Sequence, residues 1–282
     1  GPLDGPGVPM QVLSAASHDG TRLRLVRHGE GARNVLLVHG LAEHAGRYDH
    51  VIDHLVAAGH RVTLLELRGH GESEGRRGHT ERWHRYIEDL QTAAATIRRP
   101  FALVAHSMGG LVVLDALREP LTPRCIGVAL SNPLVEPASK VSGTRKRIVS
   151  RLADYVPWLP IRTELDTSLI SRDREVVLAY EADPHVYPTV TVRWAVEMLE
   201  ATRRVSDDPP LVDIPLRMML GTADGICTPR GGRGAAARWI GLVSLVAYEG
   251  AYHELFNEPD KAVVLDGLTE WLDTLEWPDV TR

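Results

Sequence analysis

Short apolar runs of strand length alternate along the chain with longer segments in which apolar residues recur at helical spacing. This alternation is typical of βαβ units that build a mostly parallel sheet flanked by helices. Residues 10–26 are interrupted by Asp19-Gly20, and because that dipeptide favours a tight turn we expect an opening antiparallel hairpin there. The other strands are expected at residues 35–38, 61–65, 101–105, 125–130, 216–220 and 243–248, and the helices at residues 47–58, 81–98, 108–118, 230–239 and 260–275.

The regular alternation lapses over residues 133–208, which are punctuated by proline and largely helical in pattern. We therefore expect residues 133–208 to form a helical cap inserted into one α/β core made of residues 10–132 and 209–282. A chain of 282 residues is long enough for a single-core domain with such an insertion. Residues 1–9 begin with Gly-Pro rather than Met, and we expect a tag remnant or a disordered N-terminus.

Composition and charge exclude several classes of protein. Apolar residues make up 44% of the chain and charged residues 24%, as in ordinary globular domains. The 32 basic and 37 acidic side chains give a net charge of −5, which argues against a nucleic-acid partner because such a partner needs clustered positive charge. No apolar run approaches the roughly 18 residues of a membrane-spanning helix. We expect a soluble protein that at most sits on a membrane surface, and its oligomeric state stays open.

The cysteines and histidines do not form a recognisable metal motif. Cys125 and Cys227 are too few for a disulfide framework and lack the paired spacing of zinc ligands, so we expect a reducing compartment and a cytoplasmic protein. His50 and His54 stand four residues apart on an expected helix, a spacing that can bind zinc, but third and fourth ligands are not evident. We expect neither a metal ion nor a cofactor.

The strongest local signal for chemistry is a strand that runs through Ser107 directly into a helix. Such a turn, called a nucleophile elbow, exposes a serine hydroxyl above the sheet and needs small residues two positions before and after it. Ala105 and Gly109 meet that need, although glycine is usual at both positions. The alternative is that Ser107 only caps the helix.

A serine hydroxyl is a poor nucleophile unless a base activates it and a third group orients that base. Asp224 and His253 each follow an expected strand, 117 and 146 residues after Ser107, in the order serine, acid, histidine that nucleophile-elbow enzymes use. His253 is the only histidine after Asp224. Taken singly, Asp224 also fits a turn residue and His253 a loop residue. Their shared placement at strand ends favours a catalytic triad.

Acyl transfer also needs donors that stabilise a developing oxyanion, and backbone amides commonly supply them. The amide of Met108 immediately follows the proposed nucleophile. A second amide is expected from the sharp turn at His39-Gly40, and Leu41 is our choice. The alternative for His39-Gly40 is an ordinary turn that ends a strand.

With these residues in place, the sequence resembles the monoacylglycerol lipases of the α/β-hydrolase fold over nearly its whole length. The resemblance implies hydrolysis of a small lipid ester, one fatty-acyl group being released from glycerol without a cofactor. The chain departs from the family pattern at Ala42, where glycine is frequent, so the position of the Leu41 amide depends on the backbone angles that Ala42 adopts. The motifs that carry the resemblance are residues 39–48 (HGLAEHAGRY), 69–75 (GHGESEG), 105–110 (AHSMGG), 221–224 (GTAD) and 249–253 (EGAYH), with residues 165–166, 169–173 and 180–184 in the cap.

The same resemblance implies that Glu43, Arg47 and Tyr180 lie near the polar end of the pocket, where glycerol would sit. Simpler interpretations stand beside this one. Glu43 and Arg47 are four residues apart, a spacing at which an ion pair forms along a helix. Tyr180 is equally consistent with packing inside the cap.

A basic stretch in the cap suggests contact with a lipid surface. Residues 140–151 carry five basic side chains and no acid, and Trp158-Leu follows. A basic amphipathic helix beside exposed apolar side chains suits a membrane interface, whereas the alternative is a cap helix with a solvated basic face. The five basic residues are Lys140, Arg145, Lys146, Arg147 and Arg151.

Two other functions compete with monoacylglycerol hydrolysis. A lysophospholipase or a broad-specificity carboxylesterase would use the same catalytic residues. A non-catalytic ligand-binding module of the same fold would keep the core but not the chemistry, and the presence of all three polar groups argues against it.

Overall fold

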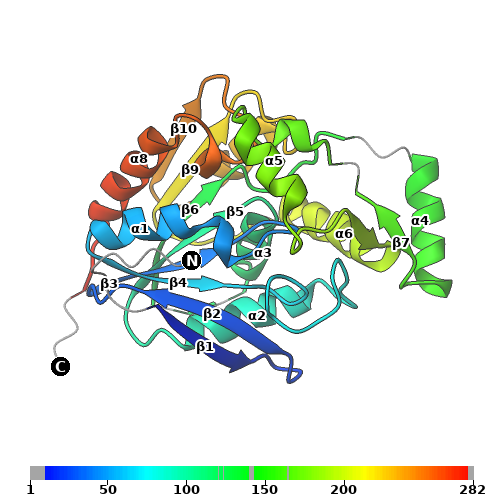
Figure 1. The fold of residues 1–282 in the computed structure, drawn as a ribbon, viewed down its shortest axis with the longest axis horizontal. Coiled ribbons are helices and arrows are strands. Elements are labelled where there is room, and N and C mark those ends of the chain that lie inside the picture. The colour runs from blue at the N-terminus through cyan, green and yellow to red at the C-terminus, as the bar shows by residue number, and fades with distance from the viewer. Residues whose placement is uncertain (1–9, 120, 123, 140–142, 164, 279–282) are drawn as a thin grey trace.

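A computed structural model describes residues 10–119, 121–122, 124–139, 143–163 and 165–278 (Figure 1). The expected tag remnant, residues 1–9, and the basic residue Lys140 lie outside the described residues. Within the described residues, no helix is both long enough and apolar enough to span a membrane.

The centre of the molecule is a mixed sheet with the strand order β1-β2-β4-β3-β5-β6-β9-β10 (Figure 1). The pairs β1–β2 and β2–β4 are antiparallel, and the remaining neighbours are parallel. The opening hairpin and the mostly parallel sheet that the sequence predicted are therefore confirmed. The strands are β1 (Gln11–Ala16), β2 (Arg22–His28), β3 (Arg33–Val38), β4 (His60–Leu65), β5 (Phe101–His106), β6 (Cys125–Ser131), β9 (Leu216–Gly221) and β10 (Val243–Tyr248).

Helices cover both faces of this sheet, because the inner strands are apolar on both sides. One apolar cluster joins the sheet to α1 (Asp49–Ala57) and α8 (Lys261–Asp273). The other joins it to α2 (His84–Ala95), α3 (Met108–Ala116) and α7 (Pro229–Ala237). Burial on both faces makes the carboxyl edge of the parallel strands the place where loops are free to carry polar groups.

The helix expected over residues 47–58 begins later than predicted. Arg47 belongs instead to a short 3₁₀ turn, η1 (Ala45–Arg47), whose Gly46 amide donates to the His44 side chain. Tyr48 follows with non-helical backbone angles, and α1 starts at Asp49. A side-chain bond to the backbone thus competes with the helix for this stretch.

The segment between β6 and β9 is the one that the sequence predicted to be a cap, and it is called the cap below. In Figure 1 its helix α4 extends to the side of the molecule. The cap contains a small antiparallel sheet, β7–β8, which the expectation of a largely helical insertion did not include. Trp194 of the cap donates its ring N–H to the Tyr86 hydroxyl of the core at 3.0 Å. The cap elements are α4 (Gly143–Tyr155), β7 (Pro160–Arg162), η2 (Thr167–Leu169), α5 (Arg174–Ala182), β8 (Thr189–Thr191) and α6 (Val192–Asp207).

Helix α3 lies close to the end of β3 because Gly109 has no side chain. A Cβ atom at Gly109 would lie 2.5 Å from the His39 carbonyl oxygen and 2.7 Å from that of Val38. These are backbone atoms, so neither can move aside without shifting the sheet. The strand-to-helix turn before α3 depends on this contact.

We expect Gly109→Ala to lower the free energy of unfolding by about 1–3 kcal/mol, because the added methyl overpacks a rigid site. Chemical denaturation measures this change. Gly234→Ala is the matched control, since it is also helical but has no atom within 4 Å of the added Cβ. Alanine is the better helix former, so the control should gain about 0.5–1 kcal/mol. Equal effects of the two substitutions would contradict the steric account.

Candidate active site

Ser107 occupies a strained turn between β5 and α3. Its φ of 50° and ψ of −116° lie in a region that non-glycine residues rarely adopt. The turn is held on both sides, since the Ser107 amide donates to Ser131 O at 3.1 Å and its carbonyl accepts from Leu134 N at 2.9 Å. The Ser107 hydroxyl makes no capping bond to the helix, so the interpretation of Ser107 as a simple helix cap does not fit.

The hydroxyl of Ser107 instead lies 2.9 Å from His253 Nε2. The other ring nitrogen of His253, Nδ1, lies 2.8 Å from Asp224 Oδ2. Asp224 follows β9 and His253 follows β10, so neighbouring parallel strands deliver both loops to the same edge of the sheet. All three side chains are buried. The structure thus brings together the three residues that the sequence singled out.

The Asp224 carboxylate has partners for both of its oxygens. Oδ1 accepts the amides of Ile226 at 2.8 Å and Cys227 at 3.0 Å, which leaves Oδ2 for His253. Burial disfavours the charged imidazole, but the Asp224 carboxylate outweighs this effect and raises the pKa of His253 above its usual value. An imidazole in this setting can take a proton from Ser107 and hold it beside an anion.

The two amides expected to bind an oxyanion belong to Met108, which follows Ser107, and to Leu41, which follows Gly40. Met108 is the first residue of α3, and a Cβ added to Gly40 would lie 3.2 Å from the Ser107 Cβ, which places the Leu41 turn close by. Neither the Leu41 nor the Met108 amide donates a hydrogen bond among the backbone bonds of the described residues. Ala42 has a φ of 57°, so the backbone at this departure from the family pattern does adopt left-handed angles.

Asn132 is a positioning residue that the sequence analysis missed. It follows β6 with a positive φ of 41°. Its side-chain nitrogen donates to the carbonyl of His253 at 2.7 Å, and its side-chain oxygen accepts the amide of Gly221 at 2.9 Å. One side chain therefore ties together the two loops that carry Asp224 and His253. An asparagine before a proline at the end of a buried strand was the available signal.

His106 was also missed, although it stands next to Ser107. Its ring lies 4.7 Å from the His253 ring, centroid to centroid, and its Nδ1 contacts the Ser131 carbonyl at 3.1 Å. Burial and the neighbouring His253 lower the pKa of His106 to about 4. His106 therefore presents an uncharged ring at neutral pH, and the His253 ring packs against it.

Glu43, Arg47 and Tyr180 form one buried cluster beside these residues. The Arg47 guanidinium carbon lies 4.5 Å from the centre of the Tyr180 ring, and Arg47 Nε is 3.8 Å from Glu43 Oε1. Glu43 Oε2 accepts the Gly40 amide at 2.6 Å and the Tyr48 hydroxyl at 2.8 Å. Glu43 therefore braces the turn that carries Leu41, in addition to facing Arg47.

Glu254 completes this cluster and was not singled out from the sequence. Its Oε2 accepts from Arg47 Nη2 at 2.7 Å. Burial raises the pKa of Glu254, Arg47 works against that rise, and Glu43 adds to it. For Glu43, burial is outweighed by His106 and Arg47, which lower its pKa. Position next to His253 was the only sequence signal for Glu254.

A cavity of about 1090 Å³ opens between the core and the cap above Ser107. Its wall contains Ser107, His253, Glu43, Tyr180 and Glu254 at one part, and mostly apolar cap side chains elsewhere. Apolar lining residues of the cap include Val149, Ile161, Leu165, Leu169, Val190, Trp194, Ala195, Val196, Met198 and Leu199. A substrate with a small polar end and a long apolar part fits this division.

The histidine pair considered as a metal site does not converge on an ion. His50 Nε2 contacts the Phe256 carbonyl at 2.7 Å, while His54 Nε2 lies 3.4 Å from Asp266. Over the part of the chain that is described, groups of three possible ligands occur at two other places, and neither includes His50 or His54. These groups are His44, Asp183 and His185, and Asp224, Cys227 and His253.

The basic stretch of the cap falls on α4. Arg147 and Arg151 are exposed, whereas Lys140 and the side chains of Arg145 and Lys146 lie outside what the structure describes. After these residues come large exposed apolar side chains, with Tyr155 80% and Trp158 56% accessible. Leu152 and Leu159 are exposed as well. This surface, Leu152, Tyr155, Trp158 and Leu159 with Arg147 and Arg151, is called the cap patch below.

Comparisons of family, sequence and structure all find proteins that are similar to this chain. The family model described as serine aminopeptidase, S33, matches residues 29–260. The chain is 34% identical over 245 residues to a monoacylglycerol lipase of Mycolicibacterium smegmatis, covering 84% of this chain and 87% of that protein. It is 32% identical to an uncharacterised abhydrolase domain-containing protein of Dictyostelium discoideum over 84% of this chain, but spans only 26% of that protein.

Among solved structures, the chain is similar to a monoacylglycerol lipase of Paleococcus ferrophilus. The TM-score is 0.83 at 28% sequence identity, and the match covers 89% of this chain and 98% of that one.

The raised pKa of Glu254 predicts a pH-dependent cost in stability. In the pH range between the ordinary pKa of a glutamate and the higher pKa of Glu254 in the folded protein, the folded state binds more protons than the unfolded state. The free energy of unfolding therefore falls as pH rises through this range. We expect Glu254→Gln to remove this fall, so that the variant gains stability relative to wild type from about pH 4.5 to neutrality. Denaturant unfolding at several pH values measures the difference.

The matched control is Glu249→Gln, because the Glu249 side chain is exposed and outside the cluster. Its stability relative to wild type should stay constant over the same pH range. A difference for Glu254→Gln that does not change with pH would contradict the assignment of the titrating group.

Proposed function

Because the chain belongs to the monoacylglycerol lipase-like serine aminopeptidase S33 family of α/β hydrolases and is a carboxylic ester hydrolase, we propose that it cleaves monoacylglycerols to a fatty acid and glycerol. The observation that carries the proposal is the arrangement of two unlike surfaces around Ser107. Buried Glu43 and Glu254 line the cap cavity together with Ser107, and the rest of the cavity wall is largely apolar.

In the proposed reaction, Ser107 Oγ attacks the ester carbonyl while His253 Nε2 takes its proton. Asp224 holds the imidazole in the tautomer that exposes Nε2 and stabilises the cation that forms. His253 then gives the proton to the departing glycerol oxygen, leaving Ser107 acylated. Support comes from the contacts of 2.9 Å and 2.8 Å that join the three side chains.

Water completes the proposed cycle. It attacks the acyl-enzyme as His253 again removes a proton, and the fatty acid leaves as Ser107 recovers its hydrogen. The Leu41 and Met108 amides stabilise the oxyanion in both halves of the reaction, and one such donor is commonly worth about 10²–10³ in rate. Left-handed angles at Ala42 support the turn that aims the Leu41 amide. No step needs a metal ion or a cofactor.

The glycerol end of the substrate is proposed to contact Glu43 and Arg47. Within the described residues, Glu43 Oε1 and Arg47 Nη1 are buried and have no hydrogen-bond partner. Buried polar atoms of this kind cost stability unless a ligand satisfies them. The two hydroxyls of a monoacylglycerol can donate to the carboxylate and accept from the guanidinium. Tyr180 packs over Arg47 and limits where its guanidinium can lie.

A substrate panel separates this proposal from its alternatives. We expect kcat/KM for a monoacylglycerol to exceed that for the methyl ester of the same fatty acid, since the methyl ester lacks the glycerol hydroxyls. Arg47→Met should reduce this preference by about 10–100-fold, the range for one or two bonds to a charged group. Ser107→Ala should abolish hydrolysis of both esters.

Other results of the panel would contradict the proposal. Faster hydrolysis of lysophospholipids would favour a lysophospholipase, and equal hydrolysis of aryl, methyl and glycerol esters a broad-specificity carboxylesterase. Cleavage of peptide amides in place of esters would favour a peptidase. Turnover of none of these would favour a non-catalytic binding module.

We also propose that the cap patch rests on the surface of the lipid that holds the substrate. Exposed aromatic and leucine side chains can enter the headgroup region while Arg147 and Arg151 meet anionic lipid. Helix α4, which carries Arg147, Arg151, Leu152 and Tyr155 of the patch, also contributes Val149 to the wall of the cap cavity. The cytoplasmic location expected from the sequence stays a prediction.

We expect Tyr155→Ser with Trp158→Ser to weaken binding to vesicles that contain phosphatidylglycerol, because each change removes an exposed aromatic ring. Arg147→Glu with Arg151→Glu should also weaken vesicle binding, and the loss should be larger at low salt than at high salt. The reason is that added ions screen the attraction between the arginines and the anionic lipid. Co-sedimentation measures the bound fraction. Val263→Ser, which alters an exposed apolar residue on α8, is the control. Equal binding by all these proteins would rule out the cap patch.

A further inference from the structure

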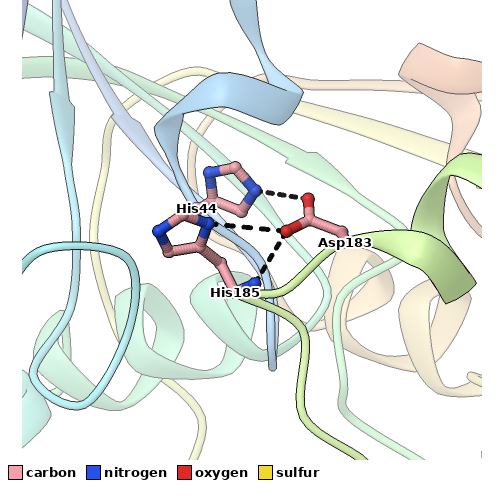
Figure 2. Close-up of side chains that lie close together, drawn as sticks. All are labelled: His44, Asp183 and His185. Carbon is pink, nitrogen blue, oxygen red and sulfur yellow. Dashed lines mark hydrogen bonds and ion pairs between the residues drawn. The ribbon is translucent and has the colours of Figure 1, made fainter.

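Three side chains that can bind a metal ion meet where the cap touches the core. His44 comes from the loop between β3 and α1, whereas Asp183 and His185 follow α5 of the cap. Figure 2 shows both imidazole rings directed at the Asp183 carboxylate. His44 Nε2 lies 2.7 Å from Asp183 Oδ2, and His185 Nδ1 lies 3.5 Å from Asp183 Oδ1. The two rings are 4.8 Å apart, centroid to centroid.

The dimensions of this group suit a small divalent ion. One ligand atom from each residue lies within 4.8 Å of the others. Zinc binds nitrogen and carboxylate oxygen at about 2.0–2.2 Å in a tetrahedron, which places neighbouring ligand atoms about 3.3 Å apart. The separation of 2.7 Å between His44 and Asp183 is shorter than this value, and the separation of 3.5 Å between His185 and Asp183 is slightly longer. Rotations of the side chains are therefore enough to enclose an ion.

Solvent can reach all three side chains. The three side chains are partly buried, with accessibilities of 16% for His44, 18% for Asp183 and 42% for His185. An ion can therefore enter from solvent, and water can fill a remaining coordination position.

We propose that His44, Asp183 and His185 form a binding site for a divalent transition-metal ion, with zinc as the best-fitting ion. Two imidazoles and one carboxylate are the ligand set of open zinc sites. Calcium and magnesium prefer oxygen ligands, so this set discriminates against them. The site is separate from the group of Asp224, Cys227 and His253.

Metal binding must move one proton. The Gly46 amide donates to His44 Nδ1 at 3.2 Å, so His44 carries its proton on Nε2 and donates it to Asp183. Coordination through Nε2 requires this proton to move to Nδ1, which gives up the Gly46 bond. The cost of this change is the loss of the Gly46 hydrogen bond, whose length of 3.2 Å is at the long end of the normal range.

A bound ion would link the cap to the loop that carries Leu41. His44 lies three residues after Leu41, and Asp183 begins the chain segment that follows α5. The ion would replace the hydrogen bond between His44 and Asp183, because both side chains would then coordinate the same cation. We therefore expect zinc to raise the thermal stability of the protein and to hold the cap against the core.

The test uses the full chain with Cys227→Ala, which removes one ligand from the second group of three. Zinc chloride is titrated by calorimetry at neutral pH, and thermal unfolding is recorded with zinc, with magnesium, and with zinc followed by EDTA. We expect one zinc ion per chain, a rise in melting temperature with zinc only, and reversal by EDTA. His185→Gln, Asp183→Asn and His44→Gln should each weaken zinc binding by at least about tenfold.

His84→Gln is the matched control, because His84 is an exposed histidine on α2 outside the group. It should bind zinc like the parent protein. His185 is the most accessible of the three residues, so His185→Gln keeps the test decisive even where His44→Gln fails to fold. Absence of zinc binding by the parent, or binding that His185→Gln and Asp183→Asn leave unchanged, would overturn the proposal.

Discussion

The turn at Ser107 is the constraint on which the rest of the site depends. Holding a non-glycine residue at a φ of 50° and a ψ of −116° costs about 1–3 kcal/mol of backbone strain, which surrounding interactions must offset. Part of it comes from the bonds of Ser107 to Ser131 and Leu134, and part from the close packing of α3 on β3 that Gly109 allows. Gly110 adds a second close approach, to Pro133. The result is a hydroxyl that leaves the sheet at its carboxyl edge and cannot relax into a helix cap.

Neighbouring strands and a continuous polar network then fix what surrounds this hydroxyl. The parallel register of β9 and β10 brings the Asp224 and His253 loops together, and Asn132 ties them to the end of β6. From His253 the chain continues to Glu254, whose carboxylate holds Arg47. Glu43, Arg47 and Glu254 thus form a buried charged cluster next to a largely apolar cavity. The proposed preference for a glycerol ester follows from that juxtaposition.

The sequence predicted those parts of the structure that are determined by residues adjacent in the chain. The tight turn at Asp19-Gly20, the strand into Ser107 and the strand-end loops of Asp224 and His253 depend on a few adjacent residues and on hydrophobic period. Asn132, Glu254 and the group around Asp183 depend on which loops meet across the sheet or between cap and core. Spacing along the chain carries no information on such contacts. The start of α1 was misplaced because the His44 side chain competes for the backbone, which propensity alone does not report.

Covalent labelling of the intact protein tests the central claim most directly. A fluorophosphonate reacts with a serine only where a base activates it and an oxyanion site stabilises the phosphorus adduct. After digestion, mass spectrometry should locate the added mass on Ser107, with Ser107→Ala unlabelled and His253→Ala labelled far more slowly. Stable labelling of another serine, or equal labelling of the wild type and Ser107→Ala, would contradict the account.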